Sequence, residues 1–282
     1  MPTEKQVAIV TGAASGLGRA MTLGLLTAGF DVAGVDRNAD GLAGVAEAAR
    51  ERQARGVLEA VGADLADPDV FDGIVAGVLA RFGRIDVLVN NAGIGQSGVR
   101  DDQRRNPIRF WEVTPEQWGR FLAVNATAPI MLARAVLPHM LARKSGRIIT
   151  VTTSLGTMIR EGYLLYGASK AAAEAAMAVL SNDLAGTDFI GTGVTANVLV
   201  PGGVTNTPLV GDDAGDRSRM LQPEVMVPPL LYLVSDEAAG VNGRRFIGAD
   251  WDASLPPAQA AEKAGAPIAW TSIARMPIEP ER

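Results

Sequence analysis

The stretch VAIVTGAASGLG, from Val7 to Gly18, decides the fold of this chain. Gln6–Thr11 is a short apolar run typical of a buried strand, and the amphipathic run Leu17–Ala28 predicts a helix directly after it. Glycine is needed where a chain turns sharply, where backbone approaches a pyrophosphate, and where a helix packs on a strand. The helix N-terminus adds free N–H groups and the positive end of its dipole. The stretch therefore predicts a phosphate-binding turn formed by Gly12, Ser15, Gly16, Leu17 and Gly18.

The residue that ends the second predicted strand indicates which dinucleotide such a turn would hold. The glycines are spaced G-x-x-x-G-x-G rather than the common G-x-G-x-x-G. On this spacing alone, the alternative that the turn binds no ligand stays open. Asp36 lies 18 residues after Gly18, where an acidic side chain accepts hydrogen bonds from the adenosine ribose. Its carboxylate would repel a 2′-phosphate, which favours NAD. Arg37 follows directly and could pair with that phosphate, so NADP is the alternative.

Short apolar runs alternate with amphipathic stretches along most of the chain. This pattern predicts an α/β fold, a doubly wound Rossmann-like parallel sheet of about seven strands with helices on both faces. We expect a single domain over residues 1–250 and a tail over 251–282 that packs on the domain or on a neighbouring subunit. The expected strands are Gln6–Thr11, Asp31–Val35, Val57–Ala63, Asp86–Asn90, Arg147–Val151, Val194–Val200 and Arg245–Ile247. The expected helices are Leu17–Ala28, Leu42–Arg55, Val70–Phe82, Pro115–Leu141, Leu165–Ala185 and Pro223–Ser235.

The composition excludes several classes of site and partner. The 282 residues include 26 Lys and Arg against 31 Asp and Glu, and the resulting net charge of −5 argues against nucleic-acid binding. The chain has no cysteine, which excludes disulfides and thiolate metal sites, and its one histidine, His139, cannot form a multi-histidine metal site. No uninterrupted apolar stretch reaches ~18 residues, so we expect no membrane span. A cytoplasmic protein without a metal is expected.

A tyrosine and a lysine at helical spacing indicate proton-transfer chemistry. Tyr166 and Lys170 are four residues apart in a helix-forming stretch, so they share one face. A free tyrosine, with a pKa of about 10, is a poor base at neutral pH. A nearby ammonium group stabilises the phenolate and lowers that pKa, and an oxidised nicotinamide would add a second positive charge. Such a tyrosine can exchange a proton with an alcohol or carbonyl oxygen.

Taken with the glycine turn, this pair resembles the short-chain dehydrogenase/reductase (SDR) family. The resemblance covers most of the chain, from Val7 to about Pro208, with weaker similarity to Gly248. The segments that carry it are TGAASGLG from Thr11, Asp64-Leu65, the NNAG segment Asn90-Asn91-Ala92-Gly93, Asn125, YGASK from Tyr166, and Pro201-Gly202 followed by Thr205 and Thr207.

The resemblance implies hydride transfer between the nicotinamide and a substrate carbon. It makes Tyr166 the base in oxidation and the acid in reduction, and Lys170 the residue that holds the nicotinamide ribose. Asn125 would fix a water that connects Lys170 to solvent, and a hydroxyl near residue 153 would orient the substrate oxygen. The further cofactor contacts that it implies are Asp64, Leu65, Asn91, Ala92, Gly93, Pro201, Gly202, Val204, Thr205 and Thr207.

Three features depart from the family pattern. The substrate-orienting hydroxyl is usually a serine thirteen residues before the tyrosine; here that position is Thr153, with Ser154 next to it. The loop after Pro201 is one residue longer than usual, so either Thr205 or Thr207 could face the nicotinamide amide. The usual double-glycine ending is replaced by Phe246-Ile247-Gly248-Ala249-Asp250-Trp251.

Two further segments exceed a minimal version of the fold. Gly95–Thr114 is a long polar loop rich in Arg and Asp, and the tail from Trp251 is rich in proline. Loops of such length are uncommon unless they have a function. Because the loop leaves a strand at the carboxyl edge of the sheet, we expect it near the substrate entrance.

The sequence therefore predicts an oxidoreductase that uses NAD(H) on a secondary alcohol or ketone. Its partners would be a small substrate and copies of itself in a homodimer or homotetramer, the latter by resemblance only. An NADP-dependent carbonyl (3-oxoacyl-type) reductase of the same fold is the first alternative. The second is a dinucleotide-binding sensor without turnover, which would have no need of a perturbed tyrosine.

Overall fold

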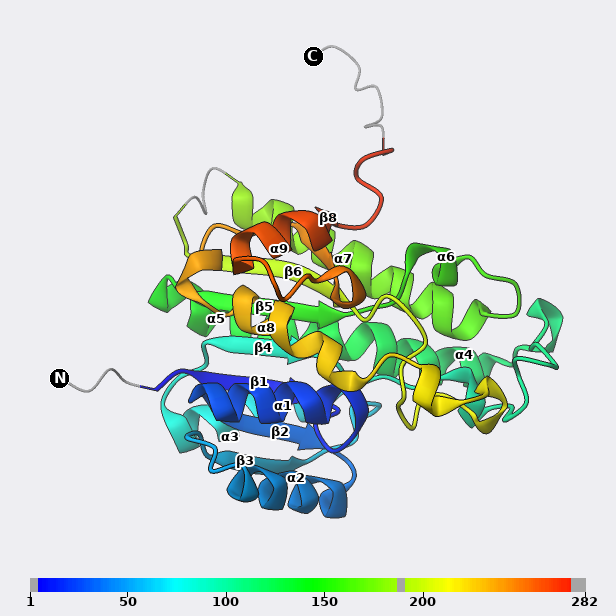
Figure 1. The fold of residues 1–282 in the computed structure, drawn as a ribbon, viewed down its shortest axis with the longest axis horizontal. Helices are drawn as coiled ribbons and strands as arrows, with labels where there is room; N and C mark the ends of the chain where they lie inside the picture. The colour runs from blue at the N-terminus through cyan, green and yellow to red at the C-terminus, as the bar shows by residue number, and fades with distance from the viewer. Residues whose placement is uncertain (1–4, 187–190, 275–282) are drawn as a thin grey trace, which may run out of the picture.

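The computed structural model describes residues 5–186 and 191–274, and its core is one sheet (Figure 1). In the described residues the sheet has eight strands in the order β3-β2-β1-β4-β5-β6-β7-β8. All neighbouring pairs from β3 to β7 are parallel, and β8 is antiparallel to β7. The strands are β1 (Val7–Thr11), β2 (Asp31–Asp36), β3 (Leu58–Gly62), β4 (Val87–Asn90), β5 (Gly146–Val151), β6 (Val194–Val200), β7 (Arg244–Ile247) and β8 (Gly265–Pro267).

Helices cover both faces of the sheet, which confirms the doubly wound α/β fold (Figure 1). Alternate residues of β1 show the two layers, because Ala8 and Val10 join one buried cluster while Val7 and Ile9 join the other. The first layer holds α1 (Gly16–Ala28), α2 (Ala39–Glu51), α8 (Val227–Leu233) and α9 (Pro257–Ala264). The second holds α3 (Val70–Phe82), α5 (Ala128–Arg143) and α7 (Ser169–Ala185).

The strand order reverses between β1 and β4, and this point places the site. From β1 the chain builds outward to β3, and from β4 it builds outward in the other direction. The connections that leave the carboxyl ends of β1 and β4 therefore diverge, and a crevice is left between them. Ligands of doubly wound sheets bind in this crevice.

Four predicted helices differ from the observed ones. The predicted Pro223–Ser235 is the 3-10 turn η8 (Pro223–Met226) followed by α8. The predicted Leu42–Arg55 begins at Ala39, because the side chain of Asn38 accepts a hydrogen bond from Gly41 N, and it ends at Glu51. The predicted Pro115–Leu141 is α4 (Pro115–Leu122), the π-turn η3 (Ala123–Thr127) and α5. The predicted Leu165–Ala185 begins with a second π-turn, η4 (Leu164–Ala168). π-turns are rare and occur frequently at functional sites.

The C-terminal tail adds a strand that the sequence did not predict. After β7 the chain forms the short 3-10 turn η10 (Gly248–Asp250) and α9, and then returns as β8 beside β7. β8 is only three residues long and includes Pro267, which lacks a donor and is tolerated at a sheet edge. The remainder of the predicted tail, residues 275–282, lies outside the described residues.

Within the described ranges, the run Pro115–Arg143 is the one helix long and apolar enough to cross a membrane, with a mean hydropathy of 1.5. Polar residues interrupt its apolar runs, so the expectation of no membrane span, which rested on uninterrupted runs, did not cover it. Half of its most apolar window is buried, and Leu132, Val136 and Met140 lie in the second core layer. Core helices of globular proteins pass the same test of length and composition.

Candidate active site

A cleft of about 1040 Å³ lies at the carboxyl ends of the central strands. One end is formed by the glycine turn, the other by the loop after β4 and the segment after β6. The predicted cofactor residues that line it are Gly12, Ser15, Gly16, Leu17, Asp36, Arg37, Asp64, Leu65, Asn91, Ala92, Gly93, Tyr166, Lys170, Pro201, Gly202, Val204, Thr205 and Thr207. Thr153 and Ser154 line it too. Gly18 and Asn125 do not line the cleft; they lie behind the residues that do.

The glycine turn has the conformation that only glycine adopts easily. Gly12 and Gly16 have φ values of 66° and 52°, in the left-handed region. A Cβ on Gly18 would lie 2.0 Å from the carbonyl oxygen of Gly12, so this glycine lets α1 pack against the end of β1. The turn is open on the cleft side and fits a phosphate group at the N-terminus of α1.

The carboxylate of Asp36 helps to shape this turn. Its Oδ2 accepts a hydrogen bond of 3.0 Å from Ala14 N, and its Oδ1 accepts one of 2.9 Å from Asn38 N. Asp36 therefore joins the end of β2 to the glycine turn while still lining the cleft. Arg37 is exposed at the same edge.

The NNAG segment ties β4 to the glycine turn. Asn91 N and Ala92 N both donate to the Thr11 hydroxyl at 3.0 Å, and Asn91 Nδ2 donates to Thr11 O at 2.9 Å. A Cβ on Gly93 would lie 3.1 Å from Asn125 Oδ1 and 3.2 Å from the Lys170 ammonium nitrogen. Glycine at this position thus leaves room for the Asn125 and Lys170 side chains next to the cleft.

Tyr166 lies on the wall of the cleft, in the π-turn η4. Desolvation raises the pKa of Tyr166 to about 12, and hydrogen bonding by the Thr153 side chain acts in the opposite direction. This differs from the prediction made from the sequence, which was that Lys170 lowers the pKa of Tyr166. In this structure the balance is reversed because burial outweighs the neighbouring polar groups. Any lowering for catalysis must come from positive charge, of Lys170 or of a bound ligand.

Lys170 and Asn125 form the support beneath the tyrosine. Burial lowers the pKa of Lys170 to about 8, and its ammonium group donates to the carbonyl of Val151 at 3.1 Å. The Asn125 amide donates to Ile94 O and to the Ser169 hydroxyl, both at 3.0 Å, and accepts from Ile94 N at 2.8 Å. Asn125 therefore holds the strand-four loop against the helix that carries Lys170.

The two candidate hydroxyls after β5 have different surroundings. Thr153 interacts with Tyr166, whereas the Ser154 hydroxyl lies 2.7 Å from that of Thr157. Ser154 is exposed and immediately precedes the short helix α6 (Leu155–Met158). Of the two, Thr153 is the hydroxyl that the structure brings to the tyrosine.

A buried ion pair lies behind Thr153. Arg245 Nε donates to Glu174 Oε1 at 2.8 Å, and the Arg245 guanidinium also donates to the Thr153 carbonyl. Glu174 accepts further hydrogen bonds from the Thr152 hydroxyl at 2.6 Å and from Ala269 N at 3.1 Å. The pair therefore joins the strand end that carries Thr153, the helix that carries Lys170, β7 and the tail.

The segment after β6 closes one side of the cleft. Thr205 is buried and donates to Gly203 O at 3.1 Å. Thr207 lies against the glycine turn, since a Cβ on Gly16 would be 3.0 Å from its side chain. Ala249 N donates to Pro201 O at 2.9 Å, so the unusual ending of β7 supports this segment from outside.

The loop over residues 95–114 is an ordered part of the cleft wall, near Tyr166. Gln96 is buried; its amide nitrogen donates to Gly162 O at 2.6 Å and its oxygen accepts from Tyr166 N at 3.2 Å. Ser97 donates to Leu209 O at 2.8 Å, which joins the loop to the segment after β6. The loop thus lines the cleft beside Tyr166, and its role at a substrate entrance stays a prediction.

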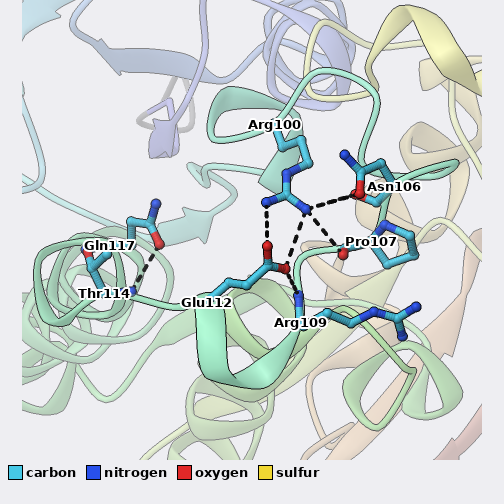
Figure 2. A network of polar contacts seen from close by, with 7 residues as sticks. All are labelled: Arg100, Asn106, Pro107, Arg109, Glu112, Thr114 and Gln117. Carbon is cyan, nitrogen blue, oxygen red and sulfur yellow. Dashed lines mark hydrogen bonds and ion pairs between the residues drawn. The ribbon is translucent and has the colours of Figure 1, made fainter.

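An internal clamp gives this loop its shape (Figure 2). Arg100 donates to Glu112 Oε1 at 3.0 Å and to the carbonyls of Asn106 and Pro107 at 3.3 Å. Glu112 Oε2 accepts a hydrogen bond of 2.6 Å from Arg109 N. One arginine thus gathers the loop into a compact turn before α4 begins.

Comparison with known proteins agrees with this geometry. The family model described as short chain dehydrogenase matches residues 6–217. The chain belongs to the short-chain dehydrogenase family. Among its curated relatives, 2-(R)-hydroxypropyl-CoM dehydrogenase of Xanthobacter autotrophicus is 32% identical over 254 residues, 86% of this chain and 96% of the relative. The 3-oxoacyl-acyl-carrier-protein reductase of Salmonella typhimurium is 28% identical over 259 residues, 86% and 95% of the two chains.

Among solved structures, a crystal structure of an NAD(P)-dependent dehydrogenase from Beutenbergia cavernae contains NADP at low occupancy. It has a TM-score of 0.73 and 34% identity, and the match covers 87% of this chain and 95% of that one. This short-chain dehydrogenase is therefore an NAD(P)-dependent oxidoreductase.

Sequence reasoning missed several residues around the site of this short-chain dehydrogenase. Glu174 had a usable signal, because it continues the four-residue spacing from Tyr166 and Lys170 and so shares their helix face. Arg245 gave a weaker signal, as a charge at the start of the predicted strand Arg245–Ile247. Gln96 and Gln103 gave none, since their burial depends on how the long loop folds back.

Proposed function

We propose that the protein transfers hydride between NAD(H) and a secondary alcohol or ketone, with Tyr166 as the general acid and base. The observation that supports this most is the arrangement at the cleft wall. The Tyr166 hydroxyl faces the Thr153 side chain, and Lys170 is buried one helical turn further on, with Asn125 beside it. A protein that only binds a dinucleotide has no need of this arrangement.

The cleft residues fit an extended dinucleotide. The open turn at Gly12 and Gly16 would take the pyrophosphate, Asp36 the adenosine ribose, and Asp64 with Leu65 the adenine edge. Gly93, Lys170 and the Pro201 segment would surround the nicotinamide half. When bound, this group supplies the hydride acceptor or donor and, when oxidised, a positive charge.

The residues of the chain would handle the proton. Tyr166 would accept the hydroxyl proton of an alcohol during oxidation and return it to the carbonyl oxygen during reduction. Thr153 would hold the substrate oxygen next to that hydroxyl, because it can both donate and accept. Lys170, held through Val151 O and next to Asn125, would stabilise the phenolate form while charged.

NAD is our preferred cofactor because Asp36 lines the cleft where a 2′-phosphate would otherwise lie. The related structure that contains NADP, and the exposed Arg37 beside Asp36, support NADP-dependent reduction as the second candidate. Asp36→Asn tests the choice, because the amide oxygen can still accept from Ala14 N while the charge is removed. If NAD is preferred, this variant should weaken NAD and improve NADP binding. Tighter binding of NADP than NAD by the wild type contradicts the preference.

The reaction is tested by a screen of oxidisable secondary alcohols with NAD and with NADP, followed through the absorbance of the reduced nicotinamide. Tyr166→Phe is the control, because it keeps the ring and removes only the hydroxyl. We expect turnover that falls by ~100-fold or more in the variant while cofactor affinity is kept. Equal turnover by both proteins would contradict the role of Tyr166.

We also propose a cytoplasmic homodimer or homotetramer, with the catalytic domain over residues 1–250 and an appended tail from 251. The large exposed apolar side chains support self-association, with Trp111 83% and Val179 60% exposed. Sedimentation analysis tests the assembly, and a monomer at all concentrations contradicts it.

A further inference from the structure

The arginines of the 95–114 loop divide into two groups. Arg100 pairs with Glu112, as Figure 2 shows, and Arg109 pairs with Glu161. Arg104 is half-buried and lines the cleft, and within residues 5–186 and 191–274 its guanidinium has no carboxylate partner. Its backbone N–H donates to Asp213 Oδ2 at 2.7 Å. The clamp therefore shapes the loop, and Arg104 is left to face the cleft.

Gln103, next to Arg104, is a buried polar side chain with unused hydrogen-bonding capacity. It is 7% exposed and lines the cleft. Its amide nitrogen donates to the Tyr163 hydroxyl at 3.3 Å, while its amide oxygen is buried without a partner in the described part of the chain. Because an amide oxygen only accepts hydrogen bonds, a bound ligand can satisfy this atom only with a donor group such as a hydroxyl.

A second arginine that lines the cleft, Arg160, contacts Tyr163. The guanidinium carbon of Arg160 lies 4.9 Å from the centre of the Tyr163 ring. Arg160 lines the cleft and is exposed, and the described residues offer it no carboxylate within 4 Å. Tyr163 is also close enough to Tyr166 to influence its ionisation. Gln103 and Arg160 thus both contact Tyr163; together with Arg104, which follows Gln103 and lines the same cleft, we term these residues the distal subsite.

Arginines outnumber carboxylates around the distal subsite although the chain has a net charge of −5. The carboxylates on this side are Asp101, Asp212 and Asp213; Asp212 is paired with Arg217 at 3.4 Å, and Asp213 accepts from Arg104 N at 2.7 Å. Arg120 adds a further positive charge to the lining. An anionic ligand would therefore be attracted to this end of the cleft.

We propose that the distal subsite binds a carboxylate group of the substrate, so that the protein acts on hydroxy acids or oxo acids. Arg104 and Arg160 supply the cationic donors that a carboxylate accepts from. The proposal rests on the proposed function, since it names the substrate class of that reaction.

The first test compares 2-hydroxybutanoate, 3-hydroxybutanoate and 5-hydroxyhexanoate, each with its methyl ester, as substrates. The ester keeps the chain and removes only the charge. We expect at least one acid to exceed its ester by ~10-fold or more in kcat/KM, the scale of one charged contact. Arg104→Gln and Arg160→Gln should raise KM for that acid with little change in KM for its ester. Arg105→Gln is the matched control, because Arg105 is exposed and does not line the cleft.

The second test does not depend on turnover. Hexanoate and hexanamide are titrated calorimetrically into the NAD-loaded wild type and the three variants. We expect hexanoate to bind more tightly than hexanamide to the wild type and to Arg105→Gln, and this preference to disappear in Arg104→Gln and Arg160→Gln. If no alcohol is oxidised but the preference for hexanoate appears and is lost in the two variants, the subsite is supported and the proposed reaction is contradicted. If alcohols are oxidised, but esters match acids or the amide binds as well as the acid, the subsite is overturned. Failure of hexanoate to bind overturns it as well.

Discussion

Arg245 and Glu174 form an ion pair of 2.8 Å in which the arginine side chain is 6% exposed and the carboxylate is fully buried. The pair is more than a link between β7 and α7. Glu174 also accepts from the Thr152 hydroxyl and from Ala269 N, and Arg245 also donates to the carbonyl of Thr153. The backbone that presents Thr153 to Tyr166 is thus held from behind by charges that water cannot reach.

Removing one member of this pair should strongly destabilise the protein. Arg245→Met leaves the Glu174 carboxylate buried without its cation, which costs roughly 3–5 kcal/mol. Urea unfolding measures the loss. The double variant Arg245→Met with Glu174→Leu should recover most of it, because no charge then remains buried. Lys263→Met is the control, since Lys263 pairs with Asp252 at the surface and such pairs contribute about 0–1 kcal/mol. A loss in Arg245→Met no larger than in this control would contradict the role of the pair.

Lys170 should reduce stability in the very state that favours activity. Burial lowers the pKa of Lys170 from 10.5 to about 8, so the folded protein resists its charged form. Below about pH 8 the lysine is charged in both states, and the folded state carries the full penalty, on the order of 3 kcal/mol. As pH rises from 8 towards 10.5 the penalty disappears.

Lys170→Met therefore should be more stable than the wild type at neutral pH, by about 1–3 kcal/mol after the lost bond to Val151 O is counted. The advantage should shrink as the pH is raised through this range, and turnover should be lost. Thermal unfolding of both proteins across the pH range measures it. A less stable variant at neutral pH, or a difference that does not change with pH, contradicts the prediction.

The central part of the fold could be predicted from the sequence because it depends on local patterns. Each of these patterns lies within a few consecutive residues and predicts the structure of those residues. They are the apolar runs at Val7 and Val194, the glycine turn and the Tyr166–Lys170 spacing. The π-turns at Asn125 and Tyr166 could not, because a helical pattern does not distinguish α from π geometry.

The substrate side of the cleft depends on contacts far apart in the chain. Gln96 is buried because it reaches Gly162, 66 residues away, and Arg104 is fixed by Asp213, 109 residues away. The pKa of Tyr166 illustrates the same limit: its neighbours were predicted, but the degree of desolvation that raises it was not. Burial is a property of the assembled cleft and cannot be read from residue spacing.

The raised pKa of Tyr166 predicts different pH responses for the two directions of reaction. With a pKa of about 12 the hydroxyl is protonated at neutral pH, so it is ready to act as an acid in reduction. Oxidation needs the phenolate, and the fraction of Tyr166 in this form rises ~10-fold for each pH unit below the pKa. Initial rates should therefore rise with pH for alcohol oxidation and stay level for ketone reduction across the neutral range. Oxidation that is independent of pH, with the chemical step limiting, contradicts this role.

The last prediction concerns the hydroxyl that orients the substrate. Thr153 faces Tyr166, whereas Ser154 is exposed and lies 2.7 Å from the Thr157 hydroxyl. Thr153→Val keeps the shape but removes the donor and acceptor, so turnover should fall by ~100-fold while cofactor affinity is kept. Thr153→Ser should retain activity because the hydroxyl remains. Ser154→Ala should be mild, since it removes only a contact at the start of α6. If Ser154→Ala costs more turnover than Thr153→Val, the substrate-orienting hydroxyl is Ser154, and the strand end must bend in the complex to present it.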